Sequence, residues 1–432
     1  MAASTKFYTV ANPIPGRYIV VLATTDLSPI AAAAPTPVSA TPKSAQAPIA
    51  SASAISSDFD SAAVVAEPAP DPVVVGTATS LTSTYGGTFS TTWSNALKGF
   101  RLSSTEAQAI SMSGDSRVAF IVQDGAIAVG SPDSTPIVMT IPPNPDRNPQ
   151  PNSSWGLDRI DQHSLPLDGL YAYHNDGNGV NAYIIDTGIL PTHWEFSGRA
   201  SAIYDALNDE GIIGVDCNGH GSHVAGIIGG RTFGVAQQVR LLSVRVLNCQ
   251  GTGSWSDVID GVNFVTWHHG QSAQQGVPAV ANMSLSGETN RAADAAVRNS
   301  IRAGVTYVVA AGNWNSDAAG YSPAGVGEAI TVGATNPQDT RAEFSNYGPA
   351  LDLFAPGVGI PSAWIGDDLM IATASGTSMA APHVAGVVAL YLQTHRTASP
   401  ATVRSAIVGN STTGVVINPG QESPNRLLFT NY

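Results

Sequence analysis

Val180-Asn181-Ala182-Tyr183-Ile184-Ile185 is a largely apolar run that ends at a carboxylate, Asp186. Other apolar runs follow it, and stretches of helical character separate them. The runs lie at 240–246, 279–285, 305–310 and 329–332, and the helical stretches at 220–229, 256–268, 292–303 and 377–394. Buried strands that alternate with helices predict an α/β fold with a doubly wound parallel sheet. Such sheets carry their sites at the carboxyl ends of strands, which is where Asp186 stands.

Length and charge narrow the class of protein. With 432 residues the chain is long enough for two to three domains. Its net charge of −13 argues against nucleic acid as a partner, because phosphate contacts need clustered Lys and Arg. No apolar stretch approaches the roughly 20 residues of a membrane span, so we expect no membrane partner. Sparse charge favours a secreted enzyme, although no signal peptide is visible at residues 1–7.

The pattern upstream of residue 155 differs from that of the α/β region. Apolar strands are predicted at 18–23, 96–102 and 117–122, and a capping-box-like Ser103-Ser104-Thr105-Glu106 opens a helix to about residue 112. This order predicts a small α+β domain. Residues 28–75 are rich in Ala, Pro, Ser and Thr, so they predict a disordered insertion. A Pro- and Asn-rich tract at 142–154 predicts an exposed linker.

Residues from separate motifs could together activate a serine. Ser378 opens the helical run after Gly376-Thr377, His220 opens another helix, and Asp186 ends a strand. A serine is a weak nucleophile unless a base removes its proton and a third group orients that base. Each residue alone has an ordinary explanation as a turn or cap residue. Their joint contexts indicate a catalytic triad, and Asn313 adds an amide that could stabilise an oxyanion.

These motifs resemble those of subtilisin-type serine proteases, within which the chain is most similar to the proteinase K and aqualysin group. The matching stretches are Ile185-Asp186-Thr187-Gly188, Asn218-Gly219-His220-Gly221, Ala310-Ala311-Gly312-Asn313 and Gly376-Thr377-Ser378-Met379-Ala380. The similarity extends from residue 155 to residue 428. It implies that Ser378 attacks the scissile carbonyl, His220 acts as general base and acid, and Asp186 orients His220. Asn313 and the Ser378 N–H would bind the oxyanion.

The resemblance also implies a substrate cleft. Gly251, Thr252 and Gly253 match an edge strand that pairs with the substrate main chain. The pocket for the residue before the cleaved bond is matched by Ser284, Leu285, Ser286, Gly287, Ala310, Ala311 and Gly312, with Tyr321 near its base. Ser286 stands where close relatives usually have a glycine. A small, uncharged lining implies broad specificity with a preference for apolar or aromatic side chains.

Residues 7–122 resemble the subtilisin propeptide, through Gly16-Arg17-Tyr18-Ile19-Val20-Val21 and Leu97-Lys98-Gly99-Phe100. The implied protein is a self-processing zymogen. It would have a ferredoxin-like propeptide domain over 7–125, a processing linker over 126–154 and a peptidase domain over 155–432. The propeptide would act as an intramolecular inhibitor and folding chaperone of a monomeric, secreted endopeptidase that acts on peptides and proteins.

Cys217 and Cys249 could form a disulfide or remain reduced, and composition alone leaves both states open. The resemblance implies the disulfide, because the two residues match a bridged pair in aqualysin-like enzymes. It also implies structural Ca²⁺, which oxygen ligands bind. One implied site is Asp158, Asp161, Gln162 and Asp168, and another is Asp352 with the carbonyls of Gly327 and Ala329. The acidic loop at 205–210 is a third candidate.

Two alternatives belong to other classes. An esterase of the α/β-hydrolase type needs Gly-x-Ser-x-Gly and the order Ser, Asp, His. Here the order is Asp, His, Ser, and Ala380 follows Met379, so both requirements fail. The other alternative is a catalytically silent binding protein with the same fold. Silencing usually removes a triad or oxyanion residue, and all of them are present in this sequence.

Overall fold

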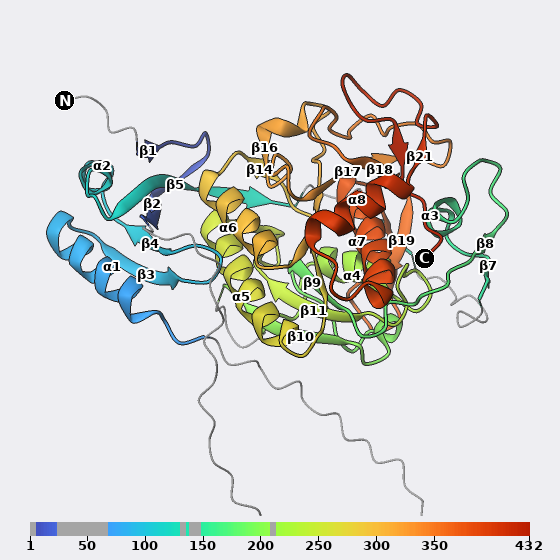
Figure 1. Cartoon of the computed structure of the whole chain (residues 1–432), viewed down its shortest axis with the longest axis horizontal. Helices are drawn as coiled ribbons and strands as arrows, with labels where there is room; N and C mark the ends of the chain where they lie inside the picture. The colour runs from blue at the N-terminus through green and yellow to red at the C-terminus, as the bar shows by residue number, and fades with distance from the viewer. Residues whose placement is uncertain (1–5, 24–67, 130–134, 138–147, 208–212) are drawn as a thin grey trace, which may run out of the picture.

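The computed structural model describes residues 6–23, 68–129, 135–137, 148–207 and 213–432. These residues form a small N-terminal unit and a larger unit built on a nine-stranded sheet (Figure 1). Most of the predicted insertion, up to residue 67, lies outside the described residues. Its last part was predicted wrongly, because residues 72–75 form the first turn of a helix that Asp71 caps.

The N-terminal unit is a sheet with two helices packed on one face. Its elements are β1 (Phe7–Tyr8), β2 (Pro13–Leu22), α1 (Pro72–Tyr85), β3 (Thr88–Trp93), β4 (Gly99–Ser103), α2 (Glu106–Ser113) and β5 (Val118–Ala128). The strand order is β1-β5-β2-β4-β3. Val20 of β2 packs among α1 and α2, whereas its neighbours Ile19 and Val21 face the larger unit. The sequence missed β3, and the capping box forms between Thr105 and Gln108.

The larger unit confirms the predicted doubly wound sheet. Its strand order is β10-β11-β9-β13-β15-β17-β18-β22-β21, and every neighbouring pair is parallel except β21 with β22. The strands are β9 (Asn181–Asp186), β10 (Ala200–Asp205), β11 (Arg240–Arg245), β13 (Ala279–Met283), β15 (Thr306–Ala310), β17 (Ile330–Thr335), β18 (Leu353–Pro356), β21 (Thr412–Thr413) and β22 (Arg426–Leu427). The strands β10, β18, β21 and β22 were not predicted from the sequence.

Helices cover both faces of this sheet because its strands are apolar on both faces. Ala182 and Ile184 of β9 pack against α4 (His220–Gly229) and α7 (Thr377–Thr394). The alternate residues Tyr183 and Ile185 pack against α5 (Trp255–Ala273) and α6 (Arg291–Arg302), which lie toward the N-terminal unit (Figure 1). The remaining helices are α3 (Trp155–Ile160), α8 (Pro400–Asn410), η1 (Trp194–Phe196) and η2 (Ala318–Gly320). Among the described residues, no helix is both long and apolar enough to cross a membrane.

Short strands lie outside the large sheet, and one of them joins the two units. β12 (Thr252–Ser254) pairs antiparallel with the end of β5. β19 (Ile360–Ala363), β20 (Ile371–Ala374) and β6 (Thr135–Ile137) form a three-stranded sheet. Two further pairs are β7 (Gln150–Pro151) with β8 (Leu170–Tyr171) and β14 (Gly287–Glu288) with β16 (Tyr321–Ser322). Residues 126–154, expected as a linker, therefore contain the end of β5 and all of β6 and β7.

Candidate active site

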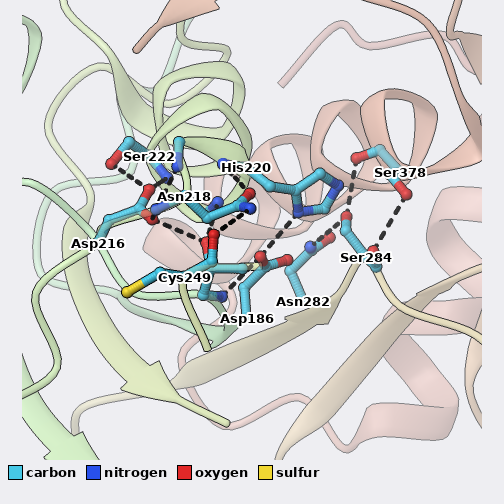
Figure 2. Close-up of polar contacts among 12 residues, drawn as sticks. Asp186, Asp216, Asn218, His220, Ser222, Cys249, Asn282, Ser284 and Ser378 are labelled. Atoms are coloured by element: carbon cyan, nitrogen blue, oxygen red, sulfur yellow. Dashed lines mark hydrogen bonds and ion pairs between the residues drawn. The ribbon is translucent and has the colours of Figure 1, made fainter. Parts of the chain in front are cut away.

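The predicted triad residues meet at the carboxyl edge of the large sheet (Figure 2). Asp186 is the last residue of β9, His220 the first of α4, and Ser378 lies in the first turn of α7; all three are buried. The His220 Nδ1 atom lies 2.7 Å from Asp186 Oδ1. The imidazole lies between Asp186 and Ser378, and its buried Nε2 has no hydrogen-bond partner in the structure. The Ser378 hydroxyl donates to the carbonyl oxygen of Ser284 at 3.1 Å.

Asp216 holds the loop that precedes His220, and sequence reasoning missed it. This buried carboxylate accepts hydrogen bonds from the N–H groups of Asn218 and Gly219 and from both the N–H and the hydroxyl of Ser222. Asn218 in turn accepts from the His220 N–H at 3.2 Å and donates to the Cys249 carbonyl at 3.0 Å. The predicted disulfide is present in the same loop, between Cys217 and Cys249. The hydrogen bonds of Asp216 and Asn218 and the Cys217–Cys249 disulfide therefore hold the start of α4 in place.

The electrostatic surroundings of His220 favour its protonated form. Burial of the imidazole lowers its pKa. The Asp186 charge and hydrogen bond, together with the Asp216 charge, raise it by more, so the pKa of His220 lies above its ordinary value. A base of this kind accepts a proton readily once it has been deprotonated.

Two nitrogen atoms that can donate hydrogen bonds lie close together beside Ser378. A Cβ atom placed on Gly376 would lie 3.4 Å from the Asn313 Nδ2 atom and 3.6 Å from the Ser378 backbone nitrogen. Thr377 binds the opposite end of the Asn313 amide, since its N–H and its hydroxyl each donate to Oδ1 at 2.9 Å. The NH₂ group of Asn313 therefore points away from Thr377 and could donate to an oxyanion.

A cavity of about 460 Å³ opens beside Ser378. Its lining is Ser284, Leu285, Ser286, Ala310, Gly312, Asn313, Trp314, Phe344, Ser375, Thr377 and Ser378. Of the residues predicted for the pocket, Ala311, Gly287 and Tyr321 are not in that lining. Tyr321 instead stacks behind Trp314, with ring centroids 4.5 Å apart. Sequence reasoning did not assign Trp314 or Phe344 to the pocket.

The end of β5 lies along the predicted substrate edge. Ala126, Ile127 and Ala128 pair antiparallel with β12, and Ala128 also forms a bridge to Ser286. The Val129 N–H donates to the Gly251 carbonyl at 2.9 Å. The chain's own strand therefore occupies the position between residues 251–253 and Ser286 that an added peptide strand would take.

The first predicted calcium segment concentrates negative charge. Asp158 accepts from the N–H groups of Asp168 and Gly169, and Asp161 accepts from the Ala172 N–H. Burial, opposed by that backbone hydrogen bond, and the charges of Asp158 and Asp168 raise the pKa of Asp161 to about 6. The Gln162 amide donates to the carbonyls of Ser164 and Pro166, which leaves its oxygen available. Within the described residues, no three His, Cys, Asp or Glu side chains converge as a metal site.

In the other two predicted calcium sites, a carboxylate pairs with an arginine. Asp352 Oδ1 is 2.5 Å from the Arg404 guanidinium, and its Oδ2 accepts from the Thr331 N–H at 2.9 Å. A cation bound by Asp352, Gly327 and Ala329 would therefore have to compete with Arg404 for the Asp352 carboxylate. In the acidic loop at 205–210, Asp205 pairs with Arg245 at 2.8 Å, and residues 208–210 lie outside the described residues.

Comparison with known proteins agrees with this geometry. Residues 177–427 match the Subtilase family. The chain is 51% identical over 340 residues to an "Extracellular serine proteinase" of Thermus sp., covering 78% of this chain and 76% of that protein. It is 46% identical to "Alkaline serine exoprotease A" of Vibrio alginolyticus, covering 78% of this chain and 59% of that protein. A solved "cold adapted subtilisin-like serine proteinase" matches with a TM-score of 0.60 and 47% identity, over 65% of this chain and 99% of that one.

The fold and these relatives define the class of the protein, a serine endopeptidase with an α/β fold. The chain belongs to the subtilase family.

Proposed function

We propose that Asp186, His220 and Ser378 are the catalytic triad of a secreted endopeptidase that processes itself. The observation that carries this proposal is the 2.7 Å contact of Asp186 with His220, whose unpartnered Nε2 faces the nucleophile side. His220 removes the Ser378 proton as the hydroxyl attacks the scissile carbonyl, and Asp186 stabilises the imidazolium. Asn313 and the Ser378 N–H stabilise the oxyanion, and His220 then protonates the leaving amine.

Substrate binding relies on main chain more than on side chains. A peptide would add as a strand between residues 251–253 and Ser286, as β5 does within this chain. Its residue before the cleaved bond would enter the cavity, whose lining contains no charged side chain and includes the rings of Trp314 and Phe344. This lining supports broad specificity with a preference for apolar or aromatic residues.

The N-terminal unit acts as an intramolecular inhibitor in this proposal. Its β5 covers the substrate edge, and polar contacts with α5 support the docking. The Arg17 guanidinium bonds the hydroxyls of Ser254 and Ser256, each at 2.9 Å. The Asn263 side-chain oxygen accepts from three consecutive N–H groups, at residues 94–96. Many contacts of this kind would keep the propeptide bound until it is degraded.

Secretion, the monomeric state and bound calcium complete the proposal. A relative's name includes the word extracellular, which supports secretion. Burial and the charge of Asp168 raise the pKa of Asp158, and burial and the charges of Asp158 and Asp168 raise the pKa of Asp161, so a divalent cation would relieve the repulsion. Calcium there would be structural and would take no part in the chemistry.

Expression of the full chain with and without Ser378→Ala tests the function. We expect the unaltered chain to shorten from 44.3 kDa and to hydrolyse casein, and the Ser378→Ala chain to do neither. Ser375→Ala is the matched control, because it removes a neighbouring cavity hydroxyl and should leave processing intact. An unaltered chain that stays at full length and never hydrolyses casein would instead support the silent binding protein.

A further inference from the structure

Ser286 carries a buried hydroxyl that has no hydrogen-bond partner in the structure. Its side chain lines the cavity beside Ser378, and the residue as a whole is only 8% exposed. Buried hydroxyls normally have a partner, because an unpaired one has given up its hydrogen bonds to water without replacement. An unpartnered hydroxyl in the wall of a cavity can therefore bind a polar group that a ligand brings.

The packing of its neighbours shows which way Ser286 points. Side chains alternate between two faces along an extended chain. The Leu285 side chain is buried in the core that α5 and α6 form. The Ser284 hydroxyl, on the opposite face, donates to the Ser378 carbonyl oxygen at 2.8 Å. Ser286 shares the face of Ser284, so its hydroxyl is directed into the cavity and away from that core.

The other hydroxyls that line the cavity have partners. Those of Ser284 and Ser378 each donate to the carbonyl oxygen of the other residue. The Thr377 hydroxyl holds the proposed oxyanion amide, and the Ser375 hydroxyl accepts from a backbone N–H at 2.9 Å. Of the lining hydroxyls, all of which belong to described residues, only that of Ser286 is left without a partner.

The main chain of Ser286 lies beside the peptide strand that the cleft would bind. Within this chain that strand is the end of β5, where Ala128 forms an antiparallel bridge to Ser286. A serine hydroxyl is attached to Cβ, so it stays close to the main chain of the paired strand. A substrate side chain that enters the cavity would therefore pass this hydroxyl with the first few atoms beyond its own Cα.

We propose that Ser286 is a specificity-determining residue that favours an amide side chain, Asn or Gln, before the cleaved bond over an apolar side chain of the same shape. This inference rests on the proposed function, because a peptide held for cleavage places that side chain in the cavity. A hydroxyl both donates and accepts, so it fits either end of an amide. Asp and Glu are rejected, since the lining contains no charged side chain to offset a carboxylate.

Peptide p-nitroanilides that differ only in the residue before the cleaved bond test this. Asn and Leu have nearly the same shape, so the kcat/KM for Asn divided by that for Leu measures the effect of the amide. In processed enzyme, Ser286→Ala should lower this ratio about 3- to 10-fold, the effect of one hydrogen bond. Ser375→Ala is the matched control, and it should leave the ratio as it is because the Ser375 hydroxyl already has a backbone partner.

Two further variants separate the hydroxyl from the shape of the side chain. Ser286→Gly should lower the ratio as Ser286→Ala does, whereas Ser286→Thr keeps a hydroxyl and should preserve most of it. Both substrates are measured on one preparation, so the ratio does not depend on the fraction of active enzyme.

A ratio that is the same in the unaltered enzyme, Ser286→Ala and Ser286→Gly would overturn the proposal. Cleavage of the Leu peptide without any cleavage of the Asn peptide by the unaltered enzyme would also overturn it, while leaving the proposed function intact. If the unaltered chain hydrolyses neither peptide, the proposed function fails and this inference falls with it.

Discussion

Thr377 holds Asn313 by two hydrogen bonds to a single atom: its N–H and its hydroxyl each lie 2.9 Å from Asn313 Oδ1. The Thr377 hydroxyl also accepts from the Gly312 N–H at 3.1 Å. The residue before Ser378 therefore orients the amide of a residue 64 positions away. Because an amide oxygen that is held fixes the direction of its NH₂ group, Thr377 is a positioning residue for the proposed oxyanion hole.

Replacement of the Asn313 side chain, whose amide would bind the oxyanion, should lower kcat without abolishing substrate binding. Asn313→Ala should reduce kcat by about 10²–10³ with little change in KM, a range that was itself measured on a subtilisin. Thr377→Val keeps the amide but removes one of its two hydrogen bonds, so we expect a smaller loss of kcat. Steady-state kinetics on one p-nitroanilide would measure both. An equal effect on KM and kcat in Asn313→Ala would place Asn313 in substrate binding instead.

Activity should depend on the deprotonated form of His220. Since the pKa of His220 is raised above its ordinary value of 6.5, kcat/KM should fall as the pH drops through that raised pKa. Below it the imidazolium has no lone pair to accept the Ser378 proton. Asp186→Asn removes a charge that raises the pKa, so its acid limb should move to lower pH, with kcat lower by about 10⁴. Acid limbs at the same pH in both proteins would contradict this electrostatic account.

The ring of Trp314 should determine part of the specificity. Trp314 lines the cavity and is half exposed, while Tyr321 stacks behind it. Trp314→Ala should reduce kcat/KM about 3- to 10-fold for Phe or Tyr before the cleaved bond, which corresponds to one aromatic contact. Substrates with Ala at that position should be unaffected, and Trp314→Phe should retain most of the preference. If Trp314→Ala instead improved the cleavage of aromatic substrates, the ring would be an obstruction.

Arg404 should stabilise the fold by neutralising a buried carboxylate. The Asp352 side chain is only 6% exposed, whereas the Arg404 side chain is 39% exposed. Arg404→Ala should lower the free energy of unfolding by about 1–3 kcal/mol, because it leaves Asp352 charged and without a cation. Urea unfolding in the Ser378→Ala background avoids self-digestion. Adding Asp352→Asn should recover part of the loss, and an additive double variant would show that the two side chains do not interact.

Calcium should stabilise the segment that contains Asp158, Asp161 and Asp168. Chelation with EDTA should lower the Tm of the processed enzyme, since it leaves mutually repelling carboxylates without a cation. Asp161→Asn should lower the Tm in calcium and remove most of the response to EDTA. Asp352→Asn is the control, and it should keep that response because Arg404 already pairs with Asp352. A Tm that does not change on chelation would contradict the proposal that the enzyme binds calcium.

Several features of the site were predictable because local sequence encodes them. The apolar run before Asp186 predicts a strand that a parallel sheet buries on both faces. The small residues around His220 and Ser378 allow neighbouring segments to lie close to the helices that these two residues begin. Gly221, for example, would place a Cβ 2.1 Å from the Gly188 carbonyl. Trp314, Asp216 and Arg404 carried no such signal, because an exposed aromatic, a loop aspartate and a helical arginine occur in most proteins.

The sequence by itself determined the fold class and the triad candidates, through hydrophobic periodicity and short motifs, whereas the disulfide was implied only by the family resemblance. Only the tertiary structure decided that β5 lies on β12 and β6 on β20, and that Arg404 rather than a metal pairs with Asp352. The physical reason is the range of these contacts. Strand edges and buried charges select partners more than 50 residues away, and that choice depends on how the whole chain closes around its core.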